Sequence, residues 1–134
     1  ASLWTVNALA HQRQRGHTEL VTMSIIRARC CELLDRSKKA DGFLLGMCSL
    51  LDVLLGQPMP TLLELLPLDE DTRQALAGAQ NARRWLLDCV VAYERGEWED
   101  CDCLAQSAGL APGLLPAAYR EALIWTHGFQ GAAA

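Results

Sequence analysis

The stretch FLLGMCSLLDVLLG, residues 43–56, decides the fold. Its apolar side chains cover most of the circumference of a helix, as is typical of a central element that is buried on several sides. Asp41 precedes this stretch as a capping residue, and Gly56 ends it. Gly42 and Gly46 are four residues apart and therefore share one helical face, so we expect another helix to approach closely there.

Helical periodicity continues on both sides of this central stretch. Apolar residues between Leu20 and Leu34 recur at steps of three and four, which predicts a helix that Thr18 caps and that ends near Lys38. The other expected helices cover residues 3–13, 62–66, 69–76, 85–96, 98–108 and 114–129. No stretch alternates like a strand, so the sequence predicts an all-α fold of seven or eight helices. We expect one domain over residues 1–130 and a featureless tail at residues 131–134.

Composition and charge restrict the classes of partner. The chain has 134 residues, of which 51% are hydrophobic and 21% charged, as in one ordinary globular domain. Its net charge of -4 disfavours binding to nucleic acid through general electrostatics. No apolar run approaches the ~20 residues that span a bilayer, and the N-terminus lacks the order of a signal peptide. We therefore expect a cytoplasmic protein whose partner is neither nucleic acid nor a membrane.

The six cysteines do not have the spacing of a metal site. They contain no C-x-x-C pair, which structural zinc sites commonly use. Cys30, Cys48, Cys89 and Cys101 fall on the apolar faces of expected helices, where free cysteine behaves as a small hydrophobic residue. We therefore expect these four thiols to be buried and the protein to bind no metal or other cofactor.

The histidines do not have the pattern of a hydrolase. A helical phosphohydrolase of the His-Asp type needs an adjacent His-Asp pair and further ligands, because its metal ions must hold and activate a water molecule. His11, His17 and His127 are isolated, and none of them precedes an aspartate. The patterns H-x-x-x-H and G-x-S-x-G are also missing. The sequence therefore offers no catalytic residue, and we expect a protein that is not an enzyme.

One spacing resembles a DNA-binding helix-turn-helix. Ala105, Gly109 and Leu115 have the required separation, but the second helix would have to read bases with polar side chains in its first turns. Residues 113–118 are Gly, Leu, Leu, Pro, Ala and Ala, and Arg120 is the first charged residue after them. A packed helical hairpin is favoured over a DNA-reading motif.

Asp52 is the acidic residue inside the apolar stretch 43–56. A buried carboxylate is costly unless it is paired and hydrogen-bonded, so a basic partner should lie close to it. Arg27 and Arg29 on the preceding helix are the nearest candidates in the sequence. We therefore predict a structural ion pair between Asp52 and one of these two arginines.

Several stretches in order resemble one family. They are RARCCELL at 27–34, the central stretch at 43–56, LLPL at 65–68, AYERGEWE at 92–99 and YREALIW at 119–125. Together they are similar to the C-terminal part of an HDOD domain, of the kind that follows an EAL domain in bacterial cyclic-di-GMP signalling proteins. The resemblance covers most of the chain.

This resemblance implies a fold and a role. The fold is the helical architecture of the His-Asp phosphohydrolases without their metal ligands. The role is that of a regulatory, non-catalytic protein-interaction module in bacterial signal transduction, linked to cyclic-di-GMP through a neighbouring domain. Two alternatives stay open: a fragment of a metal-dependent HD-type phosphohydrolase, and a helix-turn-helix DNA-binding regulator.

The resemblance also indicates where partners bind. It begins partway through the usual domain, so the expected partner is an upstream EAL-type or N-terminal HDOD segment that covers an apolar face. Leu3, Trp4, Val6 and Leu9 match the family least and are the expected interaction surface. Self-association into a homo-oligomer is expected when that partner is missing.

Overall fold

The first helix, α1 (Leu3–Leu34), is longer than the sequence predicted. The computed structural model describes residues 3–37 and 41–133, with the side chains of residues 16–37 and 41–128. The expected helix at residues 3–13 and the one expected to begin at Thr18 are a single helix, so the predicted cap at Thr18 is wrong. The residues that join the two expected helices contain no proline. They contain one glycine, Gly16, which lowers helix stability by about 1 kcal/mol relative to alanine but does not end a helix.

The central stretch is two helices, where the sequence predicted one. α2 (Gly42–Cys48) has Ser49 as its C-cap, and α3 (Leu51–Leu55) begins two residues after that cap. The hydroxyl of Ser49 donates to the carbonyl oxygen of Gly46 at 2.6 Å and accepts from Arg27 Nη1 at 3.0 Å. A side-chain bond to the backbone of this kind competes with the helical ladder, and it marks the point at which the helix breaks.

The rest of the chain follows the predicted order. The remaining helices are α4 (Met59–Leu65), α5 (Glu70–Leu76), α6 (Ala82–Glu94), α7 (Trp98–Ser107) and α8 (Leu114–Ala133). Gly96 and Gly109 follow α6 and α7 with φ of 72° and 75°, a left-handed conformation that suits glycine at a helix end. α8 continues through residues 131–133, which were expected to form a tail. Across residues 3–37 and 41–133 there are eight helices and no strand, which confirms the all-α prediction.

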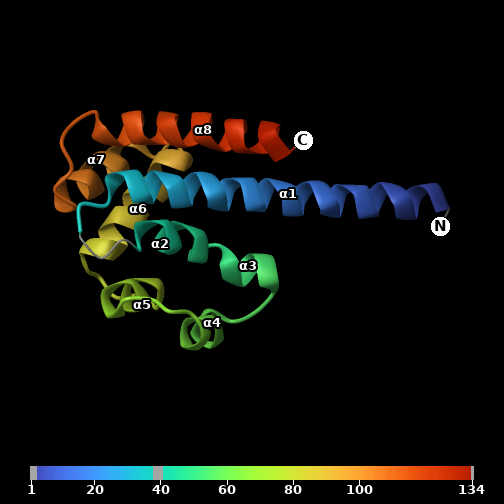
Figure 1. Ribbon diagram of the computed structural model, residues 1–134, viewed down its shortest axis with the longest axis horizontal. Helices are drawn as coiled ribbons and strands as arrows, with labels where there is room; N and C mark the ends of the chain where they lie inside the picture. The colour runs from blue at the N-terminus through green and yellow to red at the C-terminus, as the bar shows by residue number, and fades with distance from the viewer. Residues whose placement is uncertain (1–2, 38–40, 134) are drawn as a thin grey trace.

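The helices pack around α1 (Figure 1). α8 runs antiparallel along one side of α1, α2 lies along another side, and α6 also contacts it. α7 packs on α6. α3 follows the end of α2 and also contacts α1, while α4 and α5 lie farther from α8, on the α2 side of the molecule. α1 is therefore the element that the other long helices share.

Two glycines allow α2 to lie directly against α1. A Cβ atom at Gly46 would be 2.6 Å from the Cα of Ala28 and 2.6 Å from the carbonyl oxygen of Arg27. At Gly42 it would be 2.8 Å from the Cβ of Asp35. The close approach predicted from the spacing of these glycines is confirmed.

The core contains five of the six cysteines. Cys30, Cys48, Cys89 and Cys101 are buried as predicted, and Cys31 is buried beside them. Burial raises the pKa of the thiols of Cys30 and Cys89 from 9.0 to about 12, so both remain protonated at neutral pH. These residues therefore pack as small hydrophobic side chains.

Asp41 does not cap α2 with its side chain, contrary to prediction. Its carboxylate pairs with Arg83 and accepts a hydrogen bond of 2.7 Å from Thr72 Oγ1. Arg83 also pairs with Asp35 at 2.8 Å, and all four side chains are almost fully buried. This polar cluster connects the segment before α2 to α5 and α6. Asp41 therefore stabilises contacts between distant parts of the chain and does not cap its own helix.

Candidate functional site

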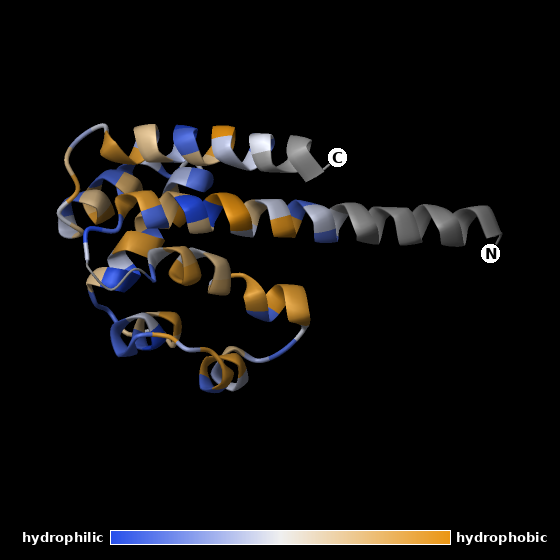
Figure 2. Ribbon diagram, viewed as in Figure 1, coloured by the Kyte–Doolittle hydropathy of each residue, from blue (hydrophilic) through white to orange (hydrophobic). Residues whose placement is uncertain are grey.

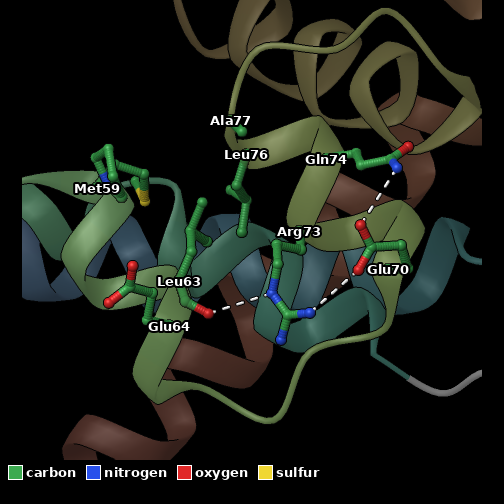
Figure 3. A pocket seen from close by; sticks show the side chains of 9 residues that line it. Met59, Leu63, Glu64, Glu70, Arg73, Gln74, Leu76 and Ala77 are labelled. Atoms are coloured by element: carbon green, nitrogen blue, oxygen red, sulfur yellow. Dashed lines mark hydrogen bonds and ion pairs between the residues drawn. The ribbon is translucent and has the colours of Figure 1, made fainter.

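A groove lies between the two short helices α4 and α5 (Figure 3). Its volume of about 720 Å³ is within the range of ligand pockets in proteins. We call it the α4–α5 groove. Its walls include Met59, Leu63 and Glu64 from α4 and Glu70, Arg73 and Leu76 from α5.

Prolines set the position and the ends of α4. Pro60 lies in the first turn, where its missing N–H leaves no helical hydrogen bond unmade. Leu66 at the other end is extended, with ψ of 140°, because a residue before a proline, here Pro67, avoids the helical region. α4 is therefore a short helix with a fixed start and a fixed end.

Arg73 holds the two walls together. Its Nε and Nη2 atoms donate to the carbonyl oxygens of Leu63 and Leu66, both at 3.2 Å. Its Nη1 atom donates to Glu70 Oε2 at 3.2 Å, and Gln74 Nε2 donates to the other oxygen of Glu70 at 3.3 Å (Figure 3). Carbonyls at a helix C-terminus have no partner within the helix, and here the next helix provides one. The spacing between α4 and α5 is thus set by hydrogen bonds.

Exposed apolar side chains lie on the helices next to the groove. Leu65 on α4 is 77% exposed, and Val53 and Leu55 on α3 are also exposed. α3 and α4 contact each other, and Figure 2 shows that α3 is largely apolar. Single exposed apolar residues are ordinary, whereas several on adjacent helices make this part of the surface a candidate for contact with a partner. Leu63 and Leu76 line the groove but are buried in the core, and Met59 is half-buried, so the exposed apolar area belongs mainly to Val53, Leu55 and Leu65.

The polar groups of the groove do not have the arrangement of a metal centre. Glu70 is bonded to Arg73 and Gln74, and Glu64 is exposed on the rim. Within the described residues, no three His, Cys, Asp or Glu side chains are grouped as a metal ion requires. The groove therefore offers apolar contact and the hydrogen-bonding groups of its rim.

The described part of the chain also contains no helix that is long and apolar enough to cross a membrane.

Arg27 is paired with Glu94 and not with Asp52. Its Nε and Nη2 atoms donate to the two oxygens of Glu94 at 3.0 and 2.7 Å, and both side chains are 8% exposed. Glu94 lies eight residues after Leu86 and four after Val90, on the buried face of α6. That spacing is the signal in the sequence that could have identified Glu94 as the partner.

Asp52 and Arg29 also have other neighbours. Asp52 is half-buried in the first turn of α3, where its Oδ1 atom accepts from the N–H of Val53 at 2.9 Å. Arg29 pairs with Glu32 and lies over the ring of Trp125, 5.2 Å from its centroid. The structure does not bring Asp52 to Arg27 or Arg29. Asp52 lies instead in the first turn of α3, a position that favours a negative charge.

The side chains of the interaction surface expected from the sequence, Leu3, Trp4, Val6 and Leu9, lie outside those that the structure describes. They belong to the first turns of α1. Sequence reasoning did not find the α4–α5 groove, which depends on bonds from Arg73 to the backbone of another helix.

Comparison with known proteins identifies two similar proteins. The chain is 34% identical over 126 residues to the uncharacterized protein YuxH of Bacillus subtilis, covering 89% of this chain and 30% of YuxH. It is 34% identical over 86 residues to the cyclic di-GMP phosphodiesterase CdgJ of Vibrio cholerae, covering 60% of this chain and 20% of CdgJ. The chain thus spans less than a third of either relative. No family model and no solved structure matches it.

Proposed function

We propose that this chain is a non-catalytic, regulatory protein-interaction module of a bacterial cyclic-di-GMP signalling protein, of the HDOD type. The signalling context is supported by the similarity to CdgJ, which is a cyclic di-GMP phosphodiesterase. The match covers 20% of CdgJ, so we carry over the context and not the reaction. The HDOD assignment is supported by the order of the resembling stretches, from RARCCELL at 27–34 to YREALIW at 119–125.

The α4–α5 groove is the observation that carries the proposal. It combines an apolar wall with hydrogen bonds that hold its shape, and exposed Val53, Leu55 and Leu65 lie on the helices beside it. A preformed apolar groove suits a partner that inserts apolar side chains from a helix or an extended segment. The partner we propose is an EAL-type or N-terminal HDOD segment of the same signalling protein.

The gene that encodes this chain provides the first test. An EAL-coding stretch upstream of it supports the proposal, and the encoded segment can then be purified and titrated into the chain by calorimetry. Leu65→Lys should weaken this binding by about tenfold or more, because it places a charge on the apolar surface. The matched control is Ile124→Lys, since Ile124 is similarly exposed but lies on α8. If both variants weakened partner binding equally, the α4–α5 groove and its neighbouring apolar residues would be excluded as the binding site.

A second assay separates the module from its alternatives. The chain alone, incubated with cyclic-di-GMP and either Mg²⁺ or Mn²⁺, is expected to release no linear product. Turnover would favour a metal-dependent phosphohydrolase.

A titration with duplex DNA at several salt concentrations tests the helix-turn-helix alternative, because phosphate contacts make affinity fall steeply with salt.

A further inference from the structure

A second cavity lies between α6, α7 and the start of α8. Its volume is about 590 Å³, and it has no residue in common with the α4–α5 groove. Trp98, Cys101, Asp102, Ala105 and Gln106 form its α7 wall, at spacings that place them on one helical face. Residues 110–113 and the first turn of α8 form the opposite wall. We call this cavity the α7 pocket.

An ordered but accessible indole lines the pocket. The ring of Trp98 packs edge-on against Tyr93, with the centroids 5.3 Å apart, and Tyr93 packs in turn against Tyr119 at 4.9 Å. Such aromatic pairs contribute about 0.5–1.5 kcal/mol beyond their buried area, so the indole is held in position. Trp98 is nevertheless 59% exposed. It therefore presents a fixed aromatic surface to a ligand.

The charge of the pocket is negative. Asp102 is the charged residue among those that line it, and no Lys, Arg or His lines it. In the described part of the chain, the carboxylate of Asp102 has no ion-pair partner, unlike Glu94, which is bonded to Arg27. Asp102 follows Trp98 by four residues, so the carboxylate and the indole are neighbours on the surface of α7. A cation that also stacks on an aromatic ring would use both groups at once.

We propose that the α7 pocket binds an arginine side chain presented by a basic segment of a partner protein. The guanidinium group is planar and weakly hydrated, stacks on aromatic faces and donates two parallel hydrogen bonds to a carboxylate. The apolar pocket walls suit the methylene groups of the same side chain. A lysine ammonium group is compact and strongly hydrated, and it uses the indole and the carboxylate less well.

The charge of the surrounding surface favours the same partner. Glu97, Glu99 and Asp100 are exposed on and beside the first turn of α7, and they outnumber the exposed Arg95 that precedes them. They attract a basic segment from a distance, whereas Trp98 and Asp102 discriminate among its side chains at close range. This assignment goes beyond the proposed function, because it adds a second recognition site on another part of the fold.

The test measures binding of a fluorescein-labelled tetra-arginine peptide by fluorescence anisotropy, with tetra-lysine and tetra-glutamate peptides for comparison. Tetra-arginine should bind several times more tightly than tetra-lysine, and tetra-glutamate should not bind. Trp98→Ala and Asp102→Asn should each weaken tetra-arginine binding by about five- to tenfold, and Trp98→Phe should retain most of it. Glu99→Gln removes the same charge from an exposed α7 residue that does not line the pocket, so it should weaken binding by less than about twofold, through long-range attraction alone.

Three results would overturn the proposal: no binding of tetra-arginine, equal binding of tetra-lysine, or equal weakening by Glu99→Gln and Asp102→Asn. The last two would mean that the peptide responds to net charge and not to the pocket. Leu65→Lys in the α4–α5 groove should leave tetra-arginine binding unchanged. The outcome for the α7 pocket is therefore separate from the outcome for the proposed function.

Discussion

Arg27 on α1 and Glu94 on α6, 67 residues apart in the sequence, form a two-pronged ion pair in which each side chain is 8% exposed. The guanidinium also donates to Ser49 at the break between α2 and α3. One buried arginine therefore connects three parts of the chain, and removing its partner leaves a buried positive charge.

Glu94→Ala should lower the free energy of unfolding by about 3–5 kcal/mol, because it leaves Arg27 buried and unpaired. Urea denaturation followed by circular dichroism measures this loss. Glu121→Ala on the exposed side of α8 is the control and should change stability by less than about 0.5 kcal/mol. Replacing both partners, as Arg27→Met with Glu94→Leu, should restore much of the loss. Similar losses for Glu94→Ala and Glu121→Ala would contradict the buried pair.

Gly46→Ala should destabilise the protein by about 1–3 kcal/mol, since the new methyl group would overlap the backbone of α1 at Ala28 and Arg27. Gly16→Ala is the matched control, because a Cβ at Gly16 meets nothing within 4 Å. In a helix this change should add about 0.5–1 kcal/mol of stability. Thermal melts of the two variants should move in opposite directions, and a shift of Gly46→Ala to higher temperature would refute the close packing.

Asp52→Ala should have a small effect. Its carboxylate is half-buried and accepts a hydrogen bond from Val53 N–H in the first turn of α3. An acid in this position contributes about 0.3–1 kcal/mol through the helix dipole. The ion pair expected from the sequence would instead have made this loss about 3–5 kcal/mol. Comparing Asp52→Ala with Glu94→Ala in one denaturation series distinguishes the two values.

Labelling of thiols in the native protein should stop at one cysteine. Cys103 is exposed, whereas the other five cysteines are buried. Mass spectrometry after brief treatment with iodoacetamide should show a single adduct, and Cys103→Ser should remove it. All six thiols should react in denaturant. Rapid modification of a second thiol in the folded protein would mean that the core opens readily.

Stability should fall at alkaline pH. Burial raises the pKa of Cys30 and Cys89 from 9.0 to about 12, so above pH 9 the unfolded chain releases these protons while the folded chain retains them. The unfolded state then binds fewer protons, and the free energy of unfolding decreases as the pH rises from 9 towards 12. Denaturation curves should show a shallower decrease for Cys89→Ala than for the parent. An identical slope would count against a buried, protonated Cys89.

The sequence predicted helix ends better than it predicted contacts between residues that are far apart in the chain. The ends of α6 and α7 at Gly96 and Gly109 were predicted correctly because one residue fixes each of them. The break at Ser49 was missed because it accompanies a hydrogen bond from Arg27, which belongs to another helix. Periodicity alone does not show which helices come into contact.

Charged partners and the candidate site were harder to predict for the same reason. Asp41 was interpreted as a helix cap, and its actual partners, Arg83 and Thr72, are 42 and 31 residues away. The α4–α5 groove depends on Arg73 reaching backbone carbonyls, which are present in every sequence and therefore leave no motif. The hydrophobic pattern identifies the helices but not the polar contacts between them.

The hydrogen bonds of Arg73 to α4 also have a consequence for binding kinetics. These bonds hold the α4–α5 groove in shape before any partner arrives. Association should therefore need no slow conformational change in this chain. The observed rate of complex formation should then increase linearly with partner concentration in a single phase. Removing these bonds would allow α4 to move relative to α5, and the rate would level off at the speed with which the groove re-forms.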